Sequence, residues 1–310
     1  MRSSGGPRVM GWRRAVSADI PALSEFLKAD EERRVGFSGR LLRNEARQAF
    51  RPASSLRLPA PLRGAVWIYE AGGEGGTASP VGGALLCHPS RLVFPIFPED
   101  AGGDRGLALL AGAFSPASVL GLASNVARYA SVFGLVPRAS VDYRLMSYPG
   151  ASGGPEAPPS APPPGYPGLS LRRATIADLD DLMPLQEAYE REEVLTPVHS
   201  FNRPACRASL ARALERQIVF AAWEDGIAVG KAGTNARGFA VDQVGGVYTL
   251  PERRGRGVAA ALMAPLLAEI GGEGKRPALF VKPGNAPARA LYRRLGLEDL
   301  DDYRADYFES

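Results

Sequence analysis

A glycine-rich turn in the last third of the sequence carries its clearest chemical signal. Residues 246–263 read G-V-Y-T-L-P-E-R-R-G-R-G-V-A-A-A-L-M, an expected strand, a tight turn and an alanine-rich helix. Glycine lets backbone amides approach a ligand closely, and the unpaired N–H groups of a helix N-terminus favour phosphate. Arginine side chains in the turn can add charge-assisted contacts. The pattern predicts a phosphate-binding turn made of Arg254, Gly255, Arg256, Gly257, Val258 and Ala259.

A second motif follows at residues 285–297 and reads N-A-P-A-R-A-L-Y-R-R-L-G-L. The turn itself has neither the Gly-Lys-Ser/Thr of a Walker loop nor the glycine spacing of a dinucleotide fingerprint. Together the two motifs resemble the GNAT superfamily of acyl-CoA-dependent N-acyltransferases. That family's Arg/Gln-x-x-Gly-x-Gly/Ala signature is matched by Arg254, Gly257 and Ala259. Its downstream element, Asn-x-x-Ala-x-x-Leu-Tyr-x-x-x-Gly-Phe, is matched from Asn285, with Leu297 in place of the phenylalanine.

The resemblance implies acetyl-CoA as cosubstrate, with its pyrophosphate on the amides of the turn and its pantetheine arm along the preceding strand. A backbone N–H near Val247 or Tyr248 would polarise the thioester carbonyl. The Gly245-Gly246 pair is suited to a bulge or splay where the arm enters the sheet. The cofactor contacts that the resemblance implies, besides residues 254–259, are Val247, Tyr248, Thr249 and Asn285.

Transfer to an amine also needs groups that move protons. A lysine-type amine has a pKa of about 10.4 and a thiol one of about 8.5, so a base or water relay and an acid both assist. The resemblance makes Tyr292 the candidate acid. The candidate bases are Asp242, in phase with Tyr248 unless a bulge changes the register, and Glu192 or Glu193 near the end of an expected helix. The choice among them stays open, since a solvated helix face is the more ordinary explanation for either glutamate alone.

Lysine is scarce, which draws attention to Lys231, one of only four lysines in the chain. It stands with Thr234 and Asn235 on an expected strand, where it either lines the acceptor site or is an edge-strand charge. The two histidines, His88 and His199, do not cluster with cysteines, and we therefore expect no metal site.

The elements expected around these motifs are helices that return onto a mixed sheet, which is an α/β fold. A helix capped by Asp178 shows apolar residues at helical spacing, and Asp225-Gly226 predicts a hairpin. Pro265 should kink or shorten the helix that begins near residue 257. In the C-terminal half we expect helices at 178–193, 203–216, from 257 and at 286–295, and strands at 171–173, 218–224, 227–235, 242–249, 277–282 and 302–308.

The two halves of the sequence resemble each other. At a fixed offset, positions 13–35 match positions 172–194 with nine identities. Between the halves, residues 149–168 contain eight prolines and five glycines, a composition typical of a semi-rigid linker. A repeat this long indicates duplicated domains rather than a solenoid.

We therefore predict two tandem GNAT-like domains, the first of them degenerate. Residues 1–148 form a divergent domain without the CoA pyrophosphate motif, 149–168 form the linker, and 169–310 form the acetyltransferase domain. The counterpart of the phosphate turn, residues 98–106, keeps Pro-Glu but loses the signature and gains acidic residues that would repel phosphate.

Composition restricts the remaining possibilities. The formal net charge of +4 is mild, and no basic run with interleaved aromatics indicates nucleic-acid binding. There is neither an apolar stretch of membrane-spanning length nor a secretory h-region, so we expect no membrane association and a cytoplasmic location. Cys87 and Cys206 are expected to be reduced, buried thiols.

Two other functions compete with N-acetyl transfer to a small-molecule or peptide amine. One is a non-catalytic acyl-CoA-binding regulator, since the signature only requires binding. The other is an interaction protein whose N-terminal half binds a macromolecule. The sequence does not name the acceptor, nor does it give the oligomeric state.

Overall fold

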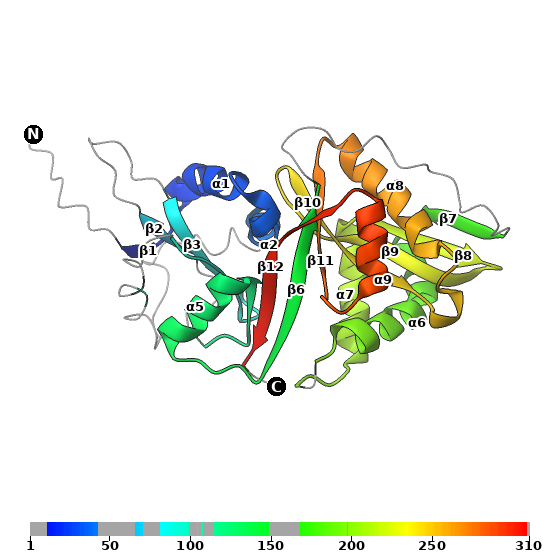
Figure 1. The fold of residues 1–310 in the computed structure, drawn as a ribbon, viewed down its shortest axis with the longest axis horizontal. Helices are drawn as coiled ribbons and strands as arrows, with labels where there is room; N and C mark the ends of the chain where they lie inside the picture. The colour runs from blue at the N-terminus through cyan, green and yellow to red at the C-terminus, as the bar shows by residue number, and fades with distance from the viewer. Residues whose placement is uncertain are drawn as a thin grey trace, which may run out of the picture. The chain divides into compact units, whose positions relative to one another are not determined.

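The computed structural model of the chain describes residues 11–42, 66–70, 81–98, 104, 107, 115–148, 168–196 and 198–308. They form two compact units, each built on a mixed β-sheet with helices on both faces (Figure 1). Unit 1 comprises residues 1–142 and 302–310, and unit 2 comprises residues 143–301. The predicted α/β class is confirmed. The predicted linker, 149–168, lies outside the described residues except for Gly168.

Unit 1 has the strand order β1-β2-β3-β4-β5-β12, in which β4 and β5 are parallel. On one face of the sheet Val126 of α5 shares a buried cluster with Val93 and Val119. On the other face α2 comes so close that a Cβ on Gly36 would lie 2.8 Å from the ring of Phe94. The elements are β1 (Trp12–Arg14), α1 (Ile20–Lys28), α2 (Glu31–Leu42), β2 (Val66–Glu70), β3 (Val81–Cys87), β4 (Leu92–Ile96), β5 (Ser118–Leu122), α5 (Ala123–Phe133) and β12 (Glu298–Tyr307).

Unit 2 has the matching order β7-β8-β9-β10-β11-β6, in which β10 and β11 are parallel. The helices α8 and α9 pack on one face of the sheet, and α6 and α7 pack on the other. The elements are β6 (Ala139–Ser147), β7 (Leu169–Arg173), α6 (Leu179–Tyr189), α7 (Arg203–Arg216), β8 (Val219–Glu224), β9 (Ile227–Arg237), β10 (Val241–Thr249), α8 (Val258–Gly272), β11 (Arg276–Val281) and α9 (Ala286–Arg294).

Local signals explain several of these element ends. Asp225 (φ 49°) and Gly226 (φ 79°) form a left-handed turn between β8 and β9, which confirms the predicted hairpin. In contrast, α8 continues through Pro265 to Gly272, so the expected shortening is wrong. Buried apolar residues lie on both sides of the proline, and their packing maintains the helix despite the missing N–H.

Two strands carry the chain from one unit into the other. β6 begins in unit 1, but its residues 144–147 pair with β11 in unit 2. β12 begins in unit 2, but its residues 303–307 pair with β5 in unit 1. Each sheet is therefore completed by a strand from the other half of the sequence. The domain boundaries that we place at 148 and 169 do not anticipate this exchange.

The internal repeat has a direct structural counterpart. In unit 1 the Asp19 carboxylate accepts two hydrogen bonds from Arg13, both at 2.8 Å. In unit 2 Asp178 accepts two from Arg172, at 2.9 and 2.6 Å. Each aspartate also accepts the backbone N–H of the residue three positions earlier. These contacts hold the pKa of Asp178 at about 2 and lower that of Asp19. The matching residues thus anchor the first helix of both units in the same way.

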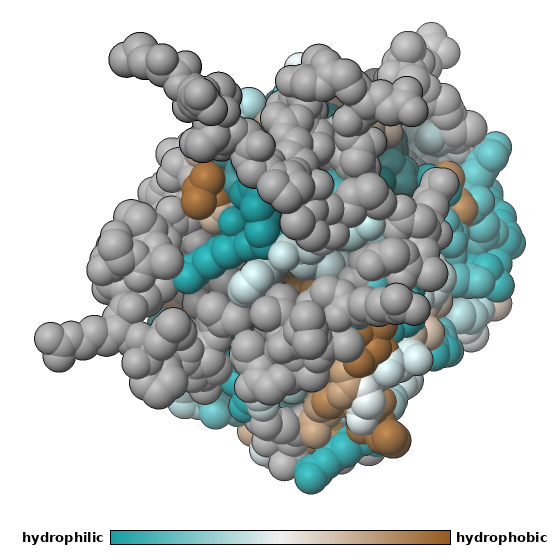
Figure 2. Space-filling model, turned by 90° about the vertical axis from the view of Figure 1, so that its left-hand side faces the viewer, coloured by the Kyte–Doolittle hydropathy of each residue, from teal (hydrophilic) through white to brown (hydrophobic). Residues whose placement is uncertain are grey.

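Figure 2 shows the side of the molecule that lies at the left of Figure 1. Among the coloured residues on this face, hydrophilic and hydrophobic side chains are interspersed. Within the described ranges, no helix combines the length and the apolar character needed to cross a membrane.

Candidate active site

The turn between β10 and α8 has a backbone that requires glycine at two positions. Gly255 (φ 75°) and Gly257 (φ 82°) both lie in the left-handed region, which costs an ordinary L-residue about 1–2 kcal/mol. Gly257 is the N-cap of α8, so the first amides of the helix have no intrahelical partner. A Cβ on Gly255 would meet no atom within 4 Å, so the backbone conformation rather than crowding explains that glycine. This geometry is what an anion-binding helix start needs.

Just before the turn, β10 contains a bulge. Between the register pairs Gly245–Gly233 and Tyr248–Lys231, two residues of β10 oppose a single residue of β9. In the described sheet, the parallel register of β10 with β11 ends at Val244, before the bulge. The predicted bulge is therefore confirmed, and it lies where the two parallel strands stop pairing.

Glu192 connects the first helix of unit 2 to the phosphate turn. After α6 the chain forms a π-helical turn, Glu190–Val194, a rare conformation often found at functional sites. The Glu192 carboxylate accepts hydrogen bonds from the Tyr248 phenol at 2.8 Å and from Arg254 Nη2 at 2.7 Å. Arg254 Nε also donates to the Thr249 carbonyl at 3.1 Å. Because Arg254 lowers the pKa of Glu192, this carboxylate stays ionised and holds the arginine at the turn.

Beside the bulge, the buried Lys231 packs against the ring of the half-buried Tyr189. Lys231 Nζ lies 4.3 Å from the centroid of the Tyr189 ring and donates to the Gly246 carbonyl at 3.0 Å. Burial lowers the pKa of Lys231 to about 8, although Glu190 acts in the opposite direction. Burial raises the pKa of Tyr189 to about 12. Sequence reasoning missed Tyr189, and the available signal was its position four residues after the buried Leu185 on the same helix.

Tyr292 lies on α9 with 7% of its surface exposed. Burial raises the pKa of its phenol well above the usual range, and Tyr189 and Glu193 raise it further. Glu193 acts on the pKa of Tyr189 in the same way. The Glu193 carboxylate also accepts a hydrogen bond from Lys282 at 3.1 Å. The structure therefore brings Tyr292, Tyr189 and Glu193 within electrostatic reach of one another.

Asp242 lies apart from this group. It is fully buried near the start of β10, where its carboxylate accepts hydrogen bonds from Arg237 and Lys275, both at 3.0 Å. On the order of 20 Å of extended strand separates it from Tyr248. Asp242 and Glu273 together pair with these two cations at the end of the strand, and this position does not support the expected role of Asp242 as a base.

The remaining positions expected to contact CoA adjoin the turn or the next helix. The Thr249 hydroxyl is buried and has no hydrogen-bond partner among the described residues, so it can accept one from a ligand. Asn285 is the N-cap of α9, and its Oδ1 accepts the Ala288 N–H at 3.2 Å. An orphaned hydroxyl next to a left-handed glycine turn fits a polar ligand such as the CoA phosphates and arm.

The counterpart of the turn in unit 1, residues 98–106, lies mostly outside the described residues. Of its charged residues, Asp104 is described, and it accepts a hydrogen bond from Arg128 at 2.8 Å. Across the described parts of both units, no group of three or more His, Cys, Asp or Glu residues could hold a metal ion. Cys87 and Cys206 are both buried free thiols, as predicted, and burial raises the pKa of each.

The fold and the site define a class of protein. Unit 2 combines a mixed sheet with one parallel pair, a bulge next to that pair and a glycine turn at a helix start, which agrees with the resemblance carried by the two motifs. Residues 181–297 match the model of the acetyltransferase (GNAT) family. These residues of unit 2 therefore form a domain of the GNAT acetyltransferase family, and the predicted resemblance is confirmed. Among curated proteins, no sequence matches this chain.

Solved structures with a similar fold span both units. A Drosophila protein aligns with a TM-score of 0.64 at 14% identity, covering 97% of this chain and 100% of its own. A tandem GNAT protein from the clavulanic acid biosynthesis pathway aligns at 0.53 and 16% identity, covering 96% and 98%. A GNAT-family acetyltransferase from Colwellia psychrerythraea aligns at 0.50 and 10% identity, covering 96% and 99%. At these identities the likeness is one of fold, and it confirms the tandem GNAT-like architecture.

Proposed function

We propose that unit 2 transfers an acetyl group from acetyl-CoA to a primary amine of a small molecule or peptide. One observation carries the proposal: the glycine turn at the start of α8 directly follows the bulge of β10. The expected phosphate site and the point where the two parallel strands stop pairing are thereby close to each other along the chain. When bound, acetyl-CoA supplies the activated acyl group as a thioester.

Different residues bind different parts of acetyl-CoA. The amides at the start of α8, with Arg254 and Arg256, hold the pyrophosphate by charge-assisted hydrogen bonds. Val247, Tyr248 and Thr249 line the pantetheine arm. Asn285 contacts the arm from the end of the adjacent strand. The ionised Glu192 contributes by holding Arg254 at 2.7 Å, so the guanidinium is oriented before the ligand arrives.

The chemical step needs one proton acceptor, one proton donor and one oxyanion donor. Glu193 takes up the proton of the attacking amine, directly or through a water, as the nitrogen bonds to the thioester carbon. A backbone N–H at Val247 or Tyr248 donates to the carbonyl oxygen, which stabilises the charge that develops there. Tyr292 donates its proton to the sulfur as the C–S bond breaks. Its raised pKa keeps the phenol protonated at neutral pH, so a proton is present on this oxygen when the C–S bond breaks.

Acetyl-CoA turnover with a panel of primary amines tests this function. We expect release of free CoA, detected with a thiol reagent, together with an acetylated amine detected by mass spectrometry. Acetyl-CoA binding measured by calorimetry, without product from any amine, would contradict the transferase. That result would favour the acyl-CoA-binding regulator.

The placement of the cosubstrate has a separate test in Gly257→Val. A β-branched residue cannot readily adopt φ 82°, so the turn must rearrange and the rise in Tm caused by CoA should disappear. Gly271→Ala, near the end of the same helix, is the matched control, since its Cβ would meet no atom within 4 Å. An unchanged CoA-induced shift in Gly257→Val would refute the placement.

A further inference from the structure

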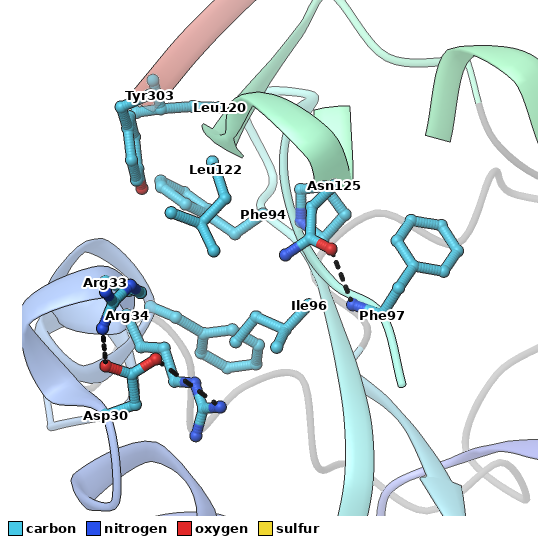
Figure 3. Close-up of a pocket in the computed structure, with 13 residues that line it drawn as sticks. Asp30, Arg33, Arg34, Phe94, Ile96, Phe97, Leu120, Leu122, Asn125 and Tyr303 are labelled. Atoms are coloured by element: carbon cyan, nitrogen blue, oxygen red, sulfur yellow. Dashed lines mark hydrogen bonds and ion pairs between the residues drawn. The ribbon is translucent and has the colours of Figure 1, made fainter. Parts of the chain in front are cut away.

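Unit 1 contains a pocket of about 280 Å³ that the transfer reaction does not use. In the described sheet, β4 and β5 are in parallel register at Leu92–Ser118 and Val93–Val119, and the pocket opens beyond these pairs. Figure 3 shows charged side chains gathered on one side of it and apolar side chains on the other. The apolar wall comes from the two strands and includes Phe94, Ile96, Leu120 and Leu122.

The charged side is supplied by α2 and the turn before it. Because Gly36 has no side chain, α2 can lie directly against the ring of Phe94. This close approach places Asp30, Arg33 and Arg34 at the pocket (Figure 3). An alanine at Gly36 would push the helix or the ring away, since its Cβ would lie 2.8 Å from Phe94.

Two arginines on this side share the carboxylate of Asp30. Asp30 forms a close ion pair with Arg33 at 2.8 Å, whereas Arg34 Nη2 lies 4.0 Å from the same carboxylate. Arg34 is held instead by the Phe26 carbonyl and by the face of the Phe26 ring, 4.3 Å from its guanidinium carbon. Its side chain is 18% exposed, and burial lowers its pKa. A mostly buried guanidinium whose carboxylate partner lies 4.0 Å away and is shared with Arg33 favours the binding of an anion.

We propose that this pocket binds a small monocarboxylate that carries an apolar chain or ring. Arg34 would receive the carboxylate, because a guanidinium matches its two oxygens in a planar fork. The strand wall would receive the apolar part. The volume is at the low end of small-molecule sites, which limits the ligand to a small molecule.

The pocket does not suit acyl-CoA, although it lies where the parallel strands β4 and β5 stop pairing. The sequence at the corresponding turn, residues 98–106, lacks the phosphate signature that unit 2 has. Two arginines and one aspartate line the pocket, a set that suits a single carboxylate better than a pyrophosphate. The proposal therefore concerns a second ligand and does not depend on the transfer reaction of unit 2.

Calorimetry on the full chain with hexanoate, acetate and hexylamine tests the proposal. We expect hexanoate to bind at least tenfold more tightly than acetate, since the longer chain buries more apolar surface. Hexylamine has the same chain but the opposite charge, and it should not compete with hexanoate for the pocket. Arg34→Gln should weaken hexanoate binding at least tenfold and leave acetyl-CoA binding unchanged. Arg207→Gln, an exposed arginine of unit 2, is the matched control and should change neither.

A second variant keeps the test decisive if Arg34→Gln does not fold. Leu122→Phe adds volume to the apolar wall and leaves the arginines in place, so it should reduce the advantage of hexanoate over acetate. Three results would overturn the proposal: no binding of hexanoate, equal binding of hexylamine, or an unchanged hexanoate affinity in a folded Arg34→Gln protein.

Discussion

Replacing Lys231 by methionine should change the pH dependence of stability in a way that the structure specifies. Lys231 is 5% exposed, and burial lowers its pKa from an ordinary 10.5 to about 8. This difference corresponds to about 3 kcal/mol of free energy, which is the cost of keeping the charge in the folded protein. Methionine has a similar length and no charge, so Lys231→Met removes that cost. It also removes the hydrogen bond to the Gly246 carbonyl, worth about 1 kcal/mol.

The sign follows from proton binding. Because folding lowers the pKa, the unfolded chain binds more protons than the folded one between pH 8 and 10.5. The wild-type protein therefore gains stability relative to the variant as the pH rises through this window, by up to about 1.4 kcal/mol per pH unit. At pH 7 the variant should be more stable by about 2 kcal/mol, and near pH 10 this advantage should vanish or reverse.

Urea unfolding of both proteins at several values from pH 7 to pH 10 gives the difference directly. Ionising groups that the two proteins share cancel in this comparison. NMR of ¹³Cε-labelled lysine provides an independent measurement, because the chain has only four lysines and their signals can be assigned by substitution. Lys28→Met, at an exposed lysine of α1, is the control. A stability difference that stays constant across this range, or a Lys231 signal that titrates above pH 10, would refute the reasoning.

Three further predictions concern single side chains. Tyr292→Phe should lower kcat at least tenfold with little change in the KM for acetyl-CoA. The control is Tyr148→Phe, which removes a buried hydroxyl that has no partner among the described residues and should leave kcat and KM unchanged. Equal rates for wild type and Tyr292→Phe across the pH range would remove the tyrosine from the mechanism. Asp242→Ala should destabilise unit 2 by about 2–3 kcal/mol, because Arg237 and Lys275 lose their buried carboxylate partner and keep the more exposed Glu273, but should retain turnover in the folded protein. Gly233→Ala should lower the free energy of unfolding in urea by about 1–3 kcal/mol, because its Cβ would lie 2.6 Å from the Ile218 carbonyl oxygen. An alanine variant as stable as the wild type would contradict the packing described.

The features that the sequence predicted correctly are local ones. The hairpin at Asp225-Gly226 and the tight glycine turn before the helix that begins near residue 257 each depend on a few consecutive residues. Their conformations are set by steric limits and nearby hydrogen bonds, which are visible in the order of residue types. The same holds for the bulge, because two adjacent glycines in a strand weaken its pairing.

The features that it missed depend on residues far apart in the chain. Strand alternation put Asp242 in phase with Tyr248, but it could not reveal the two cations that close around the aspartate. Lys231 and Tyr189 come from different elements, so their contact depends on how α6 packs on β9. Strand pattern alone also cannot say which sheet receives β6 or β12, because the period of two is the same for every partner.

The exchanged strands also determine the order in which the protein can be completed during synthesis. β5 needs residues 303–307 as its antiparallel neighbour, and the ribosome makes them about 180 residues later. The sheet of unit 1 therefore keeps β5 unpaired on this side until residues 303–307 have been translated. Such an open edge is a template for wrong pairing, so a nascent chain of this kind benefits from protection by a chaperone. For the same reason, a cut in the segment 149–167 would leave two fragments that each hold the strand the other lacks.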